Sequence, residues 1–117
     1  MQSPIAILGA GPSGLALARL LEVKGINYIV FERDSAPSEL GQGGTLDIHA
    51  GTGQEAVKQA GLFDKFRSIA RYDAQEMRMV DKDGNVLWQK TDEGQEDRPE
   101  IDRKDLRRLL LESVRGT

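Results

Sequence analysis

The amino-terminal part of the chain alternates short apolar runs with one longer stretch of helix-forming residues. Residues 5–8 are apolar and end at Gly9, which is the pattern of a strand buried on both faces. Residues 15–24 are rich in leucine and alanine and meet no helix breaker before Gly25, so they predict a helix. Residues 28–31 form a second apolar run. Strand, glycine-rich turn, helix and strand in this order predict a βαβ unit with parallel strands.

The later residues predict shorter elements and a hairpin. Asp83-Gly84 lies between two β-prone runs, which is a hairpin signal, and leucines recur at helical spacing near the carboxyl end. The polar segments 35–42 and 91–99 predict surface loops. The remaining predicted elements are a strand over 43–49, helices over 54–60, 62–70 and 105–114, and hairpin strands over 77–80 and 86–89. The predicted fold class is therefore α/β.

Composition narrows the range of partners. The chain has 117 residues, about one small domain, and is 38% hydrophobic and 30% charged, as expected for a globular protein. Its net charge is −3 and no basic tract stands out, which argues against nucleic acid as a partner.

Cysteine is absent and His49 is the only histidine, so neither a disulfide framework nor a multi-histidine metal site is expected. No apolar run reaches the roughly 20 residues that span a bilayer, and no signal peptide is apparent. We expect a cytoplasmic protein.

The strongest chemical motif lies between the first strand and the first helix. Gly9, Gly11 and Gly14 have the spacing G-x-G-x-x-G, and Glu32 follows the second strand, 18 positions after Gly14. This arrangement is typical of a Rossmann-like dinucleotide-binding unit. The residues that complete the predicted cofactor-binding turn are Pro12 and Ser13.

Each part of the motif has a physical role. Gly9 allows a sharp turn, Gly11 lets the backbone approach a pyrophosphate, and Gly14 lets the helix pack against the strands. The helix amino terminus offers N–H groups to phosphates, and Glu32 can accept hydrogen bonds from ribose hydroxyls but would repel a 2′-phosphate. The alternative is a glycine turn that binds nothing. Arg33 lies either near the adenine or a phosphate, or on the surface as an ordinary arginine.

The fingerprint does not by itself distinguish FAD from NAD, and a family resemblance bears on that choice. Residues 9–16, 31–33, 43–49 and 99–107 together resemble the class A flavoprotein monooxygenases, the p-hydroxybenzoate hydroxylase family. The likeness is closest to the tetracycline-inactivating FAD-dependent monooxygenases. It covers essentially the whole chain, and the segments Gly-Gly-Thr-Leu-Asp and Glu-Ile-x-Arg are its most specific parts.

The resemblance implies further site residues. Gly44 would let the backbone approach the flat flavin ring, Asp47 would lie by the flavin, and Arg103 would contact the FAD linker. Asp47 could instead cap a strand end, and Arg103 could be a charge on a helix surface. Leu40 stands where a basic residue would suit a nicotinamide-cofactor phosphate, which leaves the choice between NADPH and NADH open.

The resemblance also implies an activity. The parent protein would be an NAD(P)H-dependent FAD monooxygenase that inserts one oxygen atom of O2 into an aromatic or polycyclic small molecule. Residues 1–117 would be the amino-terminal part of its FAD-binding domain, inactive alone, binding FAD weakly or not at all, and able to self-associate. The alternatives are another flavin or NAD oxidoreductase and an inactive dinucleotide-binding remnant. No catalytic residue is assigned.

Overall fold

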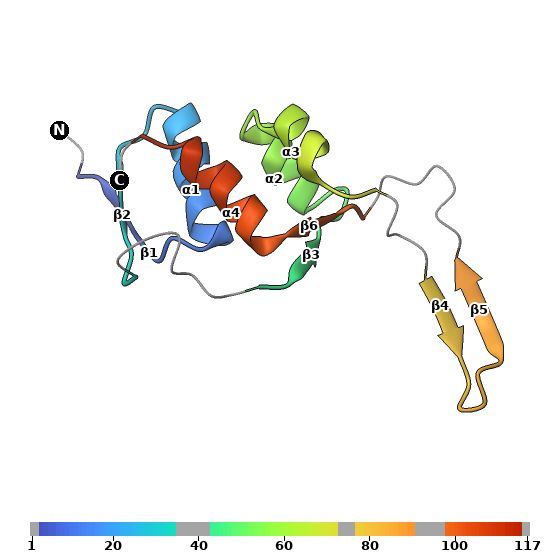
Figure 1. Ribbon diagram of the computed structural model, residues 1–117. Coiled ribbons are helices and arrows are strands. Elements are labelled where there is room, and N and C mark those ends of the chain that lie inside the picture. The colour runs from blue at the N-terminus through green and yellow to red at the C-terminus, as the bar shows by residue number, and fades with distance from the viewer. Residues whose placement is uncertain (1–2, 35–42, 73–76, 91–97, 116–117) are drawn as a thin grey trace.

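The computed structural model describes residues 3–34, 43–72, 77–90 and 98–115. These segments form four helices and six strands, and the strands pair in three two-stranded sheets (Figure 1). The elements are β1 (Ile5–Leu8), α1 (Pro12–Val23), β2 (Tyr28–Phe31), β3 (Thr45–Asp47), α2 (Gly53–Gln59), α3 (Phe63–Ile69), β4 (Met77–Val80), β5 (Val86–Lys90), β6 (Glu100–Asp102) and α4 (Arg103–Glu112). These helices and strands confirm the predicted α/β fold class.

The predicted βαβ unit is present. β1 and β2 pair in parallel with Ile5 opposite Tyr28, and α1 connects them. Ile7 and Tyr28 pack with Ala18 of α1 in a small buried cluster. The other face of the strand pair is open, and Leu8 is 83% exposed. The prediction that β1 is buried on both faces is therefore wrong for the described residues, because α1 covers only one face.

A larger core joins the helices. Leu15 of α1, Phe66 of α3 and Ile101 of β6 are each 0% exposed, and all belong to one buried cluster. The leucines of α4 that were predicted to lie on one face, Leu106, Leu109 and Leu110, are buried in the same cluster. Packing against α1 thus brings the carboxyl-terminal helix beside the first helix, as Figure 1 shows.

The short strand β3 pairs antiparallel with β6, and Asp47 lies opposite Glu100. The amino-acid sequence predicts a strand around β3 but no strand at β6, and the last helix begins at Arg103, two residues before its predicted start. The loop predicted over 35–42, which includes Leu40, lies outside the described residues, as do residues 91–97 of the loop predicted over 91–99.

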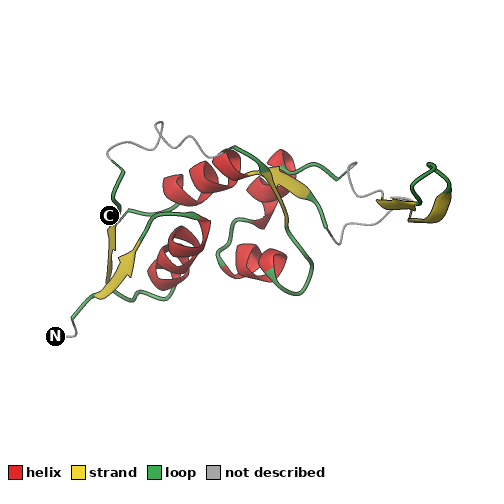
Figure 2. Ribbon diagram, turned by 90° about the horizontal axis from the view of Figure 1, so that it is seen from below, coloured by secondary structure: helices red, strands yellow, loops and turns green. Residues whose placement is uncertain are grey.

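The predicted hairpin is formed by β4 and β5. Gly84 has a φ of +84°, and the Asp81 carboxylate accepts hydrogen bonds from the backbone N–H groups of Asp83 and Asn85 at 2.9 and 2.8 Å. The helices lie between the β1–β2 pair and the hairpin (Figure 2).

Within the described segments, no helix has both the length and the apolar character needed to cross a membrane.

Candidate functional site: the glycine turn and the residues around it

The glycine turn connects the end of β1 to the start of α1. Gly9 has a φ of +106°, a conformation that favours glycine, and its N–H donates to the Phe31 carbonyl at 2.8 Å. Gly11 precedes the helix in an extended conformation, and Pro12 is its first residue. A helix has no internal acceptors for its first N–H groups, so those of Ser13 and the residue after it remain available to a ligand.

Gly14 is required for packing rather than for ligand approach. A Cβ atom at this position would collide with the carbonyl oxygen of Gly9 and lie 3.3 Å from the Ile7 side chain. The absence of a side chain therefore lets α1 lie directly against the turn and β1.

Glu32 points toward the turn. One carboxylate oxygen accepts a hydrogen bond from the backbone N–H of Ala10 at 2.6 Å. The other oxygen accepts from the N–H groups of Arg33 and Asp34 at 2.9 and 3.2 Å. These hydrogen bonds, first that from Ala10, hold the pKa of Glu32 below its ordinary value, and the nearby Arg107 guanidinium acts in the same direction.

Arg107 is a residue of this site that sequence analysis did not assign. Its Nε donates to the Ala10 carbonyl at 2.6 Å, and its Nη2 lies 3.6 Å from the Glu32 carboxylate. It follows Arg103 by four positions, so a helical register would have indicated that both project from one face of α4. That spacing was the available signal.

Gly44 and Arg103 are neighbours in the structure. The N–H of Arg103 donates to the Gly44 carbonyl at 3.0 Å, and the Arg103 side chain passes 3.9 Å from where a Gly44 Cβ would be. Asp47 lies three residues further along on β3 and is exposed. The structure thus brings Gly44 and Arg103 together, and α4 connects them to the glycine turn through Arg107. Arg33 is exposed beside Glu32.

The turn has room and donors for an anionic ligand. A Cβ atom built on Gly9 or on Gly11 would meet no described atom within 4 Å, so the backbone faces open space there. Nη1 of Arg107 is buried and has no hydrogen-bond partner in the described part of the chain. Free helix N–H groups, an open backbone and a cation beside the turn fit the diphosphate of a dinucleotide.

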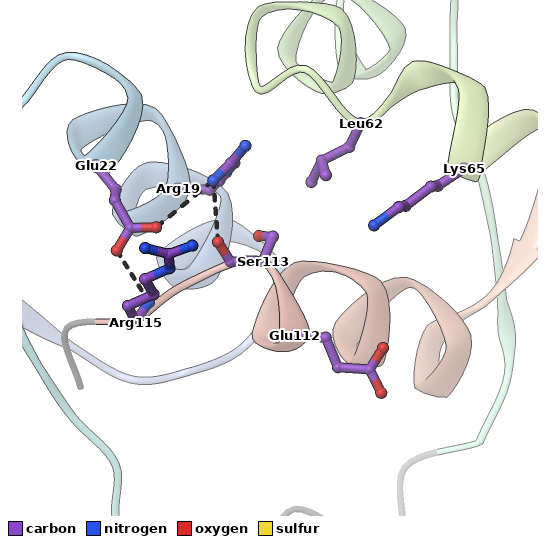
Figure 3. A pocket seen from close by; sticks show the side chains of 7 residues that line it. All are labelled: Arg19, Glu22, Leu62, Lys65, Glu112, Ser113 and Arg115. Carbon is purple, nitrogen blue, oxygen red and sulfur yellow. Dashed lines mark hydrogen bonds and ion pairs between the residues drawn. The ribbon is translucent and has the colours of Figure 1, made fainter.

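A separate cavity of about 490 Å³ lies at the opposite end of α1. Figure 3 shows that Arg19 and Glu22 from α1 meet Ser113 and Arg115 there, with Lys65 of α3 at the far side. Arg19 donates to the Ser113 carbonyl at 3.0 Å and lies 3.5 Å from Glu22. Because Arg19 donates to the Ser113 carbonyl and the Arg115 N–H donates to the Glu22 carboxylate at 2.9 Å, the cavity borders the hydrogen-bonded contact between α1 and the end of α4.

A parallel βαβ unit with a glycine turn and an acidic residue aimed at it defines a dinucleotide-binding protein of the Rossmann type. The sequence matches the family described as FAD binding domain over residues 2–115, and the chain belongs to this family.

Relatives of this family include named monooxygenases. The chain is 42% identical over 115 residues to monooxygenase penA of Penicillium thymicola, and 38% identical over 115 residues to monooxygenase asqM of Emericella nidulans. Each alignment covers 94% of this chain and 26% of the relative. The crystal structure of tetracycline destructase Tet(51) is similar with a TM-score of 0.63 at 30% identity, covering 97% of this chain and 28% of that one. The chain thus spans about a quarter of the length of these relatives.

Proposed function

We propose that this chain holds the ADP half of FAD in a flavin-dependent monooxygenase. The observation that carries the proposal is the Glu32 carboxylate, which faces the glycine turn at the Ala10 N–H, 2.6 Å away. A carboxylate in that position can accept hydrogen bonds from the adenosine ribose while the helix N–H groups bind the diphosphate.

The proposal also assigns roles to the other residues, which the family resemblance implies. Gly9, Gly11, Pro12, Ser13 and Gly14 form the diphosphate cradle. In a second group, Gly44 and Asp47 face the flavin half and Arg103 contacts the linker between the halves, while Arg33 lies at the adenine side. The hydrogen bond from the Arg103 N–H to the Gly44 carbonyl at 3.0 Å supports placing these two residues at one site, and α4 connects that site to the glycine turn.

The reaction proposed for the parent protein uses NAD(P)H and O2. Bound FAD would supply the redox and oxygen chemistry, and the residues of this chain would bind and orient it. The names of the relatives support monooxygenation, and the tetracycline destructase supports an aromatic or polycyclic substrate. Transfer of one ¹⁸O atom from labelled O2 to product, with NADPH consumed, would be the expected result for the parent. Product without ¹⁸O would contradict it.

Binding of the ADP half can be tested on this chain by flavin fluorescence. The sequence leaves open whether the chain alone binds FAD weakly or not at all, and because the turn and Glu32 already face one another we propose the first. We expect weak but saturable binding of FAD that ADP displaces and FMN does not, because FMN lacks the ADP half. Displacement by FMN and not by ADP would contradict the proposal, as would the absence of any saturable binding.

A further inference from the structure

Arg107 connects the last helix to the glycine turn. It lies on α4, its side chain is 13% exposed, and it contacts a turn 97 positions away in sequence. Its guanidinium makes two contacts at once, with Nε on the Ala10 carbonyl at 2.6 Å and Nη2 at 3.6 Å from Glu32. The fixed fork of a guanidinium suits two acceptors held side by side.

These contacts fix both peptide groups that flank Ala10. The N–H of Ala10 is bonded to Glu32, and its carbonyl is bonded to Arg107. A trans peptide is planar, and its N–H points opposite to its carbonyl. No cis peptide occurs in the described residues. Because Arg107 holds the Ala10 carbonyl, the N–H of Gly11 is directed away from α4.

We propose that Arg107 is a positioning residue that sets the glycine turn and Glu32 for the ADP half of FAD before the cofactor arrives. The inference rests on the proposed FAD-binding function. Arg107 orients one donor for the diphosphate, the Gly11 N–H, and one acceptor for the ribose, the Glu32 carboxylate. Donors that are fixed beforehand need not be ordered on binding, which increases affinity.

A simpler role for Arg107 would be to hold α4 against the rest of the fold and nothing more. That helix is already anchored by Leu106, Leu109 and Leu110, which are 6%, 7% and 3% exposed. If Arg107 only attached α4, its replacement would destabilise the whole contact between α4 and α1. If Arg107 positions the turn, its replacement changes the protection of Ala10 and the selectivity for the ribose.

The first test needs no ligand. In the Arg107→Gln variant we expect amide hydrogen exchange at Ala10 to become about tenfold faster or more, while exchange at Leu15 and Ala18 of α1 stays unchanged. Arg108→Gln, an exposed neighbour on α4, is the matched control and should leave Ala10 unchanged. Unchanged exchange at Ala10 in Arg107→Gln would overturn the inference.

If Arg107→Gln does not fold, Arg107→Lys decides the question in the same assay. A compact ammonium cannot serve Ala10 and Glu32 in fork geometry, so Ala10 should again exchange faster. If the Ala10 amide of Arg107→Lys were as protected from exchange as that of the unaltered chain, the inference would be overturned.

The second test measures ADP and 2′-deoxy-ADP affinity. We expect Arg107→Gln to weaken ADP binding about tenfold, and the loss of affinity on removing the 2′-hydroxyl to become smaller than in the unaltered chain. If the ratio of the ADP affinity to the 2′-deoxy-ADP affinity were the same in Arg107→Gln as in the unaltered chain, a role of Arg107 in orienting Glu32 would be contradicted. If the unaltered chain binds neither nucleotide, the proposed function fails, while the exchange test still decides what Arg107 does.

Discussion

At the residue scale, Gly11 and Gly14 belong to one motif but are required for different reasons. Gly14 is enclosed by the Gly9 carbonyl and the Ile7 side chain, whereas Gly11 faces open space with an ordinary φ of −77°. The structure therefore requires glycine at position 14 for packing, and we propose that Gly11 is needed for ligand approach. Substitution by alanine separates the two requirements.

We expect Gly14→Ala to lower the free energy of unfolding by about 1–3 kcal/mol, because the new methyl group must displace the backbone of the turn. Gly11→Ala should leave stability within about 1 kcal/mol and weaken ADP binding tenfold or more. Urea unfolding and calorimetric titration measure the two effects. Equal effects of both substitutions on stability would contradict this assignment.

The lowered pKa of Glu32 predicts a contribution to stability that depends on pH. A carboxyl group whose pKa is lower in the folded state stabilises the fold above its unfolded value, about 4.3, and this contribution is lost as pH falls through the folded pKa. Glu32→Gln should therefore reduce the loss of stability between about pH 5 and pH 2. Urea midpoints across this range measure it, with the exposed Glu112→Gln as control.

Glu22 and Asp81 also have lowered pKa values, from hydrogen bonds led by the Arg115 and Asn85 N–H groups respectively. These two carboxylates should account for part of the acid sensitivity that remains in the Glu32→Gln variant. If stability falls with pH in Glu32→Gln as it does in the unaltered chain, then Glu32 contributes nothing to the acid sensitivity.

How far the site could be predicted depends on the range of each interaction. Gly9, Gly14 and Glu32 follow from local spacing, because a turn, a helix and the next strand are adjacent in the chain. Arg107 acts across 97 positions, and nothing in its own neighbourhood indicates the Ala10 carbonyl. The close approach of Arg103 to Gly44 likewise depends on the β3–β6 pairing.

At the scale of elements, apolar periodicity and turn residues were sufficient to predict four helices and five strands, which leaves one strand of the described residues unpredicted. β6 was missed because it is three residues long and gains its partner, β3, from a distant segment. The openness of the β1–β2 face was also missed, since an apolar run shows that a strand suits burial and does not show what covers it.

Arg19 joins three helices. Its Nε donates to the Ala60 carbonyl at the end of α2, and its Nη1 donates to the Ser113 carbonyl at the end of α4, both at 3.0 Å. A cation at a helix carboxyl terminus is favourable because it satisfies free carbonyls and opposes the helix dipole.

We expect Arg19→Gln to lower the free energy of unfolding by about 1–3 kcal/mol, since two carbonyls lose a charged donor. Thermal and urea unfolding measure it, and the exposed Arg108→Gln is the matched loss of charge. A change no larger than that of Arg108→Gln would show that these caps do not stabilise the helix contact.

At the scale of the whole molecule, the chain is extended. Its radius of gyration is 17.3 Å and its extents are 63 × 28 × 21 Å, whereas a compact domain of this length has a radius near 13 Å. Apolar side chains are exposed at both ends, with Leu8 at 83% and Phe31 at 53% on the β1–β2 pair, and Leu87 at 65% and Trp88 at 48% on the hairpin. Parallel strands are normally covered on both faces.

We therefore propose that the chain alone self-associates through these surfaces. Sedimentation equilibrium should show a mass above that of the monomer that increases with concentration. Leu8→Glu should shift the distribution toward monomer, and Ser3→Glu, which adds the same charge at another exposed position, should not. A monomer at every concentration would contradict self-association.

The central claim is that the ADP half of FAD binds at the glycine turn beside Glu32. Titrating the ¹⁵N-labelled chain with ADP and following the backbone amide signals tests it most directly. The account predicts that the largest shifts occur at Gly11, Ser13 and Gly14 and near Glu32. Shifts centred instead on the cavity around Lys65 and Arg115, or no shifts at saturating ADP, would contradict it.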